Sequence, residues 1–87
     1  MPPRRRRPPR SDDHAALGEA IRQIRLEAGL SQEQVAERAA TDFTQIGRLE
    51  RGTANPNYTT LLRIAAALDT GVEAIVNRAA EIAEPGG

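Results

Sequence analysis

Apolar residues recur every three or four positions in five separate stretches of the chain, which is the spacing of one face of an α-helix. In the first stretch Leu17, Ile21 and Ile24 form such a face. Gly29 and Gly52 follow two of the stretches, as expected where a helix ends in a residue of positive φ. The pattern therefore predicts five helices, at residues 14–28, 32–39, 43–51, 58–68 and 72–83.

The second and third predicted helices are short, and only residues 40–42 separate them. Ser31 is a suitable N-cap for the second helix, because its hydroxyl can accept a hydrogen bond from a free backbone amide. Asp42 can cap the third helix in the same way, and Ile46 and Leu49 of that helix are predicted to point inward. Two short helices joined by three or four residues describe a helix-turn-helix.

Several spaced motifs in and after this region agree in order with one known family. They are Leu30-Ser31-Gln32, Val35-Ala36, Ile46, Leu49-Glu50-Arg51-Gly52, Asn55-Pro56 and residues 61–68. Over residues 17–76 the chain resembles the helix-turn-helix of phage repressor and Cro proteins and their bacterial Xre-type relatives. The resemblance implies an all-α, five-helix lambda-repressor-like domain that binds double-stranded DNA through its second and third helices. Ala40 departs from the family, which usually has glycine in this turn, and alanine at positive φ costs about 1 kcal/mol.

The resemblance assigns contacts with base edges to exposed positions of the third helix. These positions are Phe43, Thr44, Gly47 and Arg48. Arg48 can donate two hydrogen bonds to the O6 and N7 atoms of guanine, and Gly47 would let the helix lie close to the groove. Most relatives have a polar residue in place of Phe43, which either contacts a thymine methyl group or folds back onto the second helix. The alternative for Arg48 is a solvated surface charge.

A second set of polar residues is expected to contact DNA phosphates. It comprises Gln32, Gln45, Arg51, Thr53, Asn55 and Asn57. Gln32 matches a phosphate-binding position of the family, and a helix N-terminus favours anions because its first amides are free. Alternatively, Gln32 only caps its own helix. Asn55-Pro56-Asn57 is also a turn signal, and Asn57 can cap the fourth helix.

The formal net charge is zero, but the positive charge is unevenly distributed. Residues 1–10 contain five arginines and no acidic residue, whereas residues 11–87 contain seven arginines and twelve acidic residues, a formal charge of −5. The acidic body would need a local basic face and the N-terminal segment to bind nucleic acid. Proline and repelling charges predict a disordered arm at residues 1–13, before a domain at 14–83 and a flexible end at 84–87. The arm is either a solubilising tail or a DNA contact through Arg4, Arg5, Arg6, Arg7 and Arg10.

Two further expectations concern how the domain is held together and how it associates. In the family, residues at the positions of Arg25 and Glu50 pair, so we expect a structural ion pair between the first and third helices. The apolar stripe of the fifth helix is longer than a small bundle covers, and an exposed apolar stripe often marks an interface. A homodimer contact is therefore expected at Val72, Ile75, Val76, Ala79 and Ile82. Alternatively, this helix folds back or frays.

Composition argues against several other classes of protein. Without cysteine and with one histidine, the chain is not expected to bind a metal, and no apolar run approaches the length of a membrane span. No nucleophile–base pair or phosphate-binding loop is evident, so no enzyme activity, cofactor or small-molecule ligand is expected. The predicted function is a cytoplasmic, nucleoid-associated transcriptional regulator that binds an inverted-repeat operator as a homodimer. Alternatives with the same fold are an antitoxin and an adaptor that docks a partner protein such as an RNA polymerase subunit or a toxin.

Overall fold

A computed structural model describes residues 9–83 of the chain. Within this range the chain forms five α-helices and no strand, which confirms the predicted all-α class. The helices are α1 (Pro9–Glu27), α2 (Gln32–Arg38), α3 (Phe43–Glu50), α4 (Tyr58–Ala67) and α5 (Val72–Ala83). None of these helices has both the length and the apolar character that crossing a lipid bilayer requires.

The first helix begins at Pro9, so the predicted start at residue 14 is wrong. Ser11, Asp12 and Asp13 are residue types that often cap a helix, which favours the later start in the sequence. Proline is well suited to the first turn of a helix, because the amide it lacks would have no partner within the helix there. The arm predicted for residues 1–13 is correspondingly too long, and Arg10 belongs to the first turn of α1. The other predicted arm residues, Arg4, Arg5, Arg6 and Arg7, lie outside the described residues.

The helices α1 to α4 all end in the same backbone arrangement. After each helix one residue has a positive φ, and these residues are Gly29 (74°), Ala40 (55°), Gly52 (77°) and Asp69 (61°). In every case the amide of this residue donates to the carbonyl three residues before it. The amide of the next residue donates to the carbonyl five residues before itself, and all these distances are 2.9–3.2 Å. This is the Schellman motif, which satisfies carbonyls that the helix itself leaves free. Two of the four positions are therefore occupied by residues whose Cβ atom disfavours the conformation, and aspartate tolerates it better than alanine.

Replacing Ala40 with glycine is expected to raise the free energy of unfolding by about 1 kcal/mol, because glycine adopts a φ of 55° without a steric cost. Urea denaturation would measure the change. Ala80 is exposed in the interior of α5, so Ala80→Gly is a matched control that should lower stability by about 1 kcal/mol. If both replacements lowered stability, the turn between α2 and α3 would not be strained.

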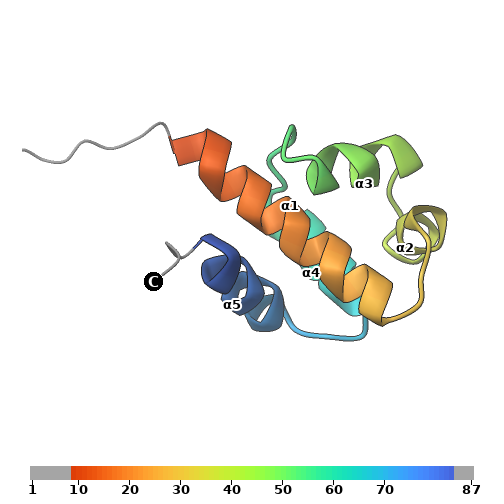
Figure 1. Cartoon of the computed structure of the whole chain (residues 1–87). Coiled ribbons are helices and arrows are strands. Elements are labelled where there is room, and N and C mark those ends of the chain that lie inside the picture. Colours follow the sequence, from red (N-terminus) through yellow and green to blue (C-terminus); the bar gives the residue numbers. More distant parts are fainter. Residues whose placement is uncertain (1–8, 84–87) are drawn as a thin grey trace, which may run out of the picture.

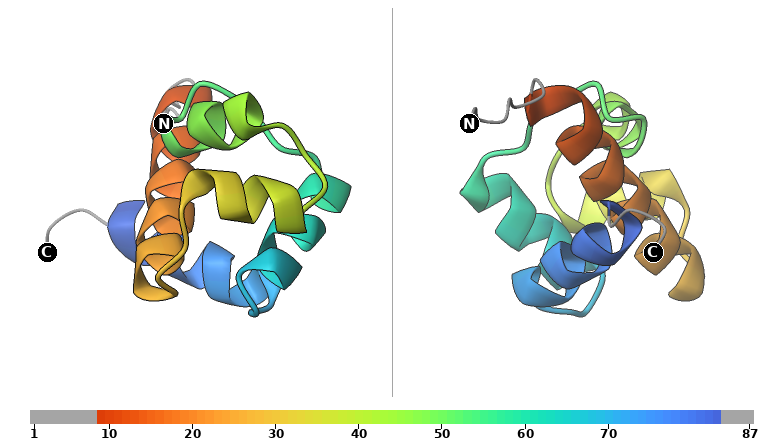
Figure 2. Two further views of the ribbon diagram at one scale, coloured as in Figure 1. Left: turned by 90° about the vertical axis from the view of Figure 1, so that its right-hand side faces the viewer. Right: turned by 60° about the vertical axis from the view of Figure 1, so that its left-hand side comes forward.

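The long helix α1 lies between the α2–α3 pair and α5 (Figure 1). Helices α3 and α5 pack on different faces of α1, and α2 contacts both α3 and α4. The largest fully buried side chains come from every helix and are Ile21, Val35, Ile46, Leu49, Ile64 and Ile75. The inward orientation predicted for the two apolar residues of α3 is thus confirmed. The left view of Figure 2 shows that α2 and α3 lie together on one side of the molecule.

The apolar stripe of α5 is largely covered by α1. Ile75 is completely buried within a single chain, and Val72, Ala79 and Ile82 pack against the edge of the core. The predicted dimer contact is therefore wrong for Ile75, which belongs to the core. Packing against α1 accounts for this burial, and residues 13–17 of α1 and residues 76–83 of α5 also line one shared apolar groove. Val76 stays 47% exposed.

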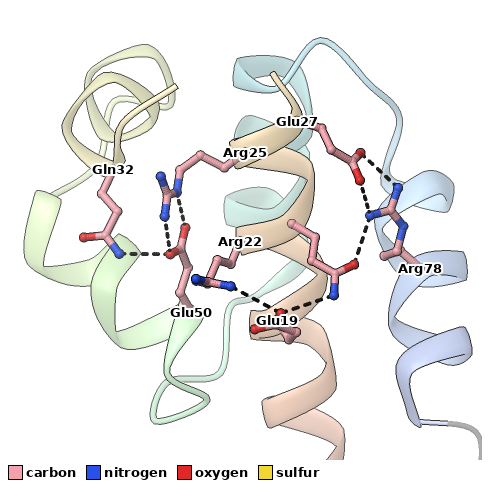
Figure 3. A network of polar contacts seen from close by, with 8 residues as sticks. Glu19, Arg22, Arg25, Glu27, Gln32, Glu50 and Arg78 are labelled. Carbon is pink, nitrogen blue, oxygen red and sulfur yellow. Dashed lines mark hydrogen bonds and ion pairs between the residues drawn. The ribbon is translucent and has the colours of Figure 1, made fainter. Parts of the chain in front are cut away.

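A polar contact also connects α5 to α1. Arg78 donates to the two carboxylate oxygens of Glu27, at 2.8 and 3.0 Å, and to Oε1 of Gln23 at 3.0 Å (Figure 3). These hydrogen bonds from Arg78 lower the pKa of the Glu27 carboxyl group. The Glu27 side chain is 60% exposed, so solvent screens the pair and the contact mainly orients α5.

Two helices approach closely where α1 crosses the end of α3. A Cβ atom built on Gly18 would lie 2.1 Å from the carbonyl oxygen of Leu49 and 2.8 Å from that of Glu50. Both distances are well below any real contact of a Cβ atom, and both partners are backbone atoms that cannot turn aside. Gly18 therefore sets the distance at which α3 is held against α1.

Candidate nucleic-acid interface

One side of α3 faces solvent on the outside of the molecule. Phe43 is 51% exposed, and Thr44 and Arg48 are also exposed, whereas Ile46 and Leu49 lie on the opposite side in the core. Residues spaced by three or four positions share one side of a helix, so positions 43, 44, 47, 48 and 51 form a single face. The half-exposed ring of Phe43 remains available for an outside contact. The exposed face thus combines an aromatic ring, a hydroxyl group and a guanidinium group.

Gly47 is buried, so the prediction that it is exposed on this face is wrong. A Cβ atom built on Gly47 would lie 3.1 Å from Nη1 of Arg51 and 3.9 Å from Oε1 of Gln32. The guanidinium group of Arg51 therefore lies over Gly47. Helical side chains lean toward the N-terminus, so a residue covers the turn before its own Cα atom. Sequence spacing predicts the side of the helix on which a residue lies, but not the neighbouring side chain that covers it.

A buried ion pair fixes α3 to α1 behind the exposed face. Nε and Nη2 of Arg25 donate to the two carboxylate oxygens of Glu50, at 2.6 and 3.0 Å, and each residue is 8% exposed (Figure 3). Nη1 of Arg25 also donates to the carbonyl oxygen of Leu30 at 2.9 Å. The hydrogen bonds to Glu50 raise the pKa of the Arg25 guanidinium group. The ion pair expected from the family resemblance is present, and it joins α1, the segment before α2 and the end of α3.

Gln32 extends this network to the first residue of α2. Its Nε2 atom donates to Oε1 of Glu50 at 2.9 Å (Figure 3). It does not cap its own helix, because Ser31 and Gln34 form a reciprocal capping box, with Oγ of Ser31 accepting from the Gln34 amide at 3.0 Å. The S-x-x-Q signal for this box was present in the sequence, whereas the partner of Gln32 lies 18 residues away and had no local signal. At the start of α3, Asp42 occupies the N-cap position, but its side chain makes no capping hydrogen bond.

Some polar side chains of the loop between α3 and α4 form hydrogen bonds within the chain. Oγ1 of Thr53 donates to the carbonyl oxygen of Arg48 at 3.1 Å. Asn57 is the N-cap of α4, and its Oδ1 atom accepts from the amide of Thr60 at 2.8 Å. Asn55 is exposed. Turn formation and capping are therefore established roles of this loop, which begins directly after α3.

The charged residues leave a local positive area on α3, although the body of the chain is acidic. Arg22, Arg25 and Arg78 pair with carboxylates of the same chain. Four exposed arginines of the described residues, Arg38, Arg48, Arg51 and Arg63, take part in no ion pair. Two of them, Arg48 and Arg51, lie in and at the end of α3. The N-terminus of α2, with its free amides and partial positive charge, lies beside them at Gln32. The arrangement can therefore attract an anionic ligand at this side of the molecule.

Known proteins are similar to this chain in sequence. The profile of a family described as Helix-turn-helix matches residues 21–75. The chain is 38% identical to the immunity repressor protein of Bacillus phage phi105 over 68 residues. These aligned residues are 78% of this chain and 47% of that protein. It is 40% identical to control protein C.SmaI of Serratia marcescens over 62 residues. These aligned residues are 71% of this chain and 74% of that protein. The chain thus spans about half the length of the phage repressor.

The fold is also similar to that of solved structures. The restriction-modification controller protein C.AhdI from Aeromonas hydrophila superposes with a TM-score of 0.71 and 33% sequence identity. The superposition covers 72% of this chain and 96% of that chain.

Proposed function

Because the chain belongs to the helix-turn-helix family, we propose that it is a transcriptional regulator that binds double-stranded DNA sequence-specifically as a homodimer. The observation that carries this proposal is the exposed face of α3, where Thr44 and Arg48 project from a helix fixed to the core by a buried ion pair. The names of its relatives are those of repressors and controller proteins, as the sequence predicted, and not those of enzymes. They support control of a promoter as the outcome of binding.

In the proposed complex α3 enters the major groove and places its base-facing side chains against base edges. Arg48 would donate two hydrogen bonds to a guanine, and Thr44 and Phe43 would contact a base edge or a thymine methyl group. Gln32 at the start of α2 would contact a phosphate, together with the polar residues Gln45, Thr53, Asn55 and Asn57. The phosphate contacts supply affinity and the base contacts supply the choice of site.

The homodimer would place two α3 helices in successive major grooves, with half-sites about 34 Å apart. The outer side of α5 supports an interface there, because Val76 is 47% exposed between partly buried apolar neighbours. These neighbours are Val72, Ala79 and Ile82. Occupancy of an inverted-repeat operator in the nucleoid would then regulate the promoter that contains it.

Selection from random duplex DNA at about physiological salt tests this function. The expected result is an inverted repeat whose half-sites are centred one helical turn apart, about 10 base pairs. Recovery of no motif, with only weak binding that salt abolishes, would contradict sequence-specific regulation and would favour the alternative of a protein-docking adaptor.

Replacing Arg48 with alanine is expected to reduce discrimination at one base pair of each half-site by about 1–3 kcal/mol, because one bidentate contact is lost. Binding to the selected operator and to single-base variants of it would measure the change. Arg63→Ala removes the same charge from the exposed surface of α4 and should leave the base preference unchanged. An equal loss of affinity for every sequence would identify Arg48 as a phosphate contact instead.

A further inference from the structure

We infer that Arg51 is a second base-reading residue, and that the absence of a side chain at Gly47 gives its guanidinium group access to the base-facing side of α3. The inference rests on the proposed DNA-binding function and adds a specificity-determining residue to it. The sequence-based prediction places Arg51 among the residues that contact phosphates.

The position of the Arg51 side chain supports the inference. Its Cα atom belongs to the C-cap of α3, yet its Nη1 atom lies 3.1 Å from the place where a Cβ atom of Gly47 would be. The side chain therefore turns back along the helix by one turn and places its guanidinium group on the face that also carries Thr44 and Arg48.

The side chain of Gln32 also lies next to the built Cβ position of Gly47. Oε1 of Gln32 lies 3.9 Å from the same built Cβ position of Gly47. The orientation of this amide is not free, because its Nε2 atom donates to Oε1 of Glu50 at 2.9 Å. Gln32 and Arg51 thus both border the space over Gly47 that a larger side chain would fill. The buried Arg25–Glu50 pair in this way orients Gln32, which borders the same space over Gly47 as Arg51.

The chemistry of a guanidinium group suits this position. Its planar, forked donors match the O6 and N7 acceptors of guanine in the major groove, and lysine does not reproduce this geometry. Arg48 and Arg51 are three residues apart, so they lie on adjacent parts of the face and would read different base pairs. The predicted operator therefore has two guanine preferences in each half-site, one for each arginine.

Selection from random duplex DNA is carried out with the full chain and with Arg51→Ala, Arg51→Lys, Gly47→Leu and Gly47→Ala. Arg51→Ala and Gly47→Leu are expected to lose guanine preference at the same operator position, by about 5- to 150-fold. Arg51→Lys is expected to lose this preference while the dependence of affinity on salt stays unchanged. Gly47→Ala is expected to retain it, because the flexible end of Arg51 needs to move by only a few tenths of an ångström.

Controls distinguish a failure of this inference from misfolding of a variant and from a failure of the proposed function. Leucine is favoured over glycine in helices, so the Gly47→Leu chain should fold, and circular dichroism during heating checks this. Arg63→Ala controls for the loss of one exposed positive charge and should leave the motif intact. An unchanged motif for Arg51→Ala, with equally weaker binding to all sequences and a salt slope reduced by about one, would overturn the inference and leave the proposed function standing. If the unsubstituted chain selected no motif at all, the proposed function would fail together with the inference.

Discussion

Replacing Glu50 with alanine is expected to lower the free energy of unfolding by about 3–5 kcal/mol, because it leaves the Arg25 guanidinium group buried without its partner charge. Arg25 is 8% exposed, and two of its three nitrogen atoms donate to Glu50. The third nitrogen donates to the carbonyl oxygen of Leu30, which does not neutralise the charge. Urea denaturation followed by circular dichroism would measure the loss.

An exposed pair of the same chain provides the matched control for this prediction. Arg22 and Glu19 lie 3.4 Å apart with side chains that are 49% and 39% exposed, so Glu19→Ala should cost less than about 1 kcal/mol. The double replacement Arg25→Met with Glu50→Leu should recover most of the stability, because apolar side chains of similar size remove the buried charge as well as its partner. A loss of less than about 1 kcal/mol in Glu50→Ala would mean that water reaches Arg25.

The Glu50 variants also separate stability from DNA binding. In the double variant Gln32 no longer has the carboxylate that accepts from its Nε2 atom. We therefore expect this variant to fold but to bind its operator more weakly than the unsubstituted chain. Binding at a temperature well below the unfolding midpoint of both proteins would measure the difference.

Replacing Gly18 with alanine is expected to destabilise the domain by about 3 kcal/mol, because one methyl group would overlap two backbone carbonyls at the crossing of α1 and α3. The built Cβ atom lies 2.1 Å from the oxygen of Leu49. Relief of this overlap requires the two helices to separate, which would also disturb the buried pair beside it. Thermal and urea unfolding of the variant would measure the effect.

The same chemical change in the other helix provides the control. Gly47→Ala meets only the flexible end of Arg51, so the higher helix propensity of alanine should raise the stability by up to about 1 kcal/mol. The two glycine-to-alanine replacements should thus differ in sign. Equal effects would show that the distance between α1 and α3 adjusts easily and that Gly18 does not set it.

Local signals explain why much of the fold could be predicted. Ser31 and the glycines at 29 and 52 mark helix ends, and their effects act over a few residues. The start of α1 was predicted wrongly because a Ser-Asp-Asp capping signal and a proline at the first turn both fit a helix start, and local rules do not rank them.

The sequence alone determined the five helices and the inward side of α3, because helical spacing fixes the direction of each side chain relative to its own helix. Its spaced motifs carried the resemblance to the helix-turn-helix family. Only the tertiary structure decided that Ile75 is core, that Arg51 covers Gly47, and that Gln32 is held by Glu50. Each of these depends on a neighbour from another turn or another helix, often many residues away. Which side chain is covered, and which partner it contacts, depends on how all five helices pack together.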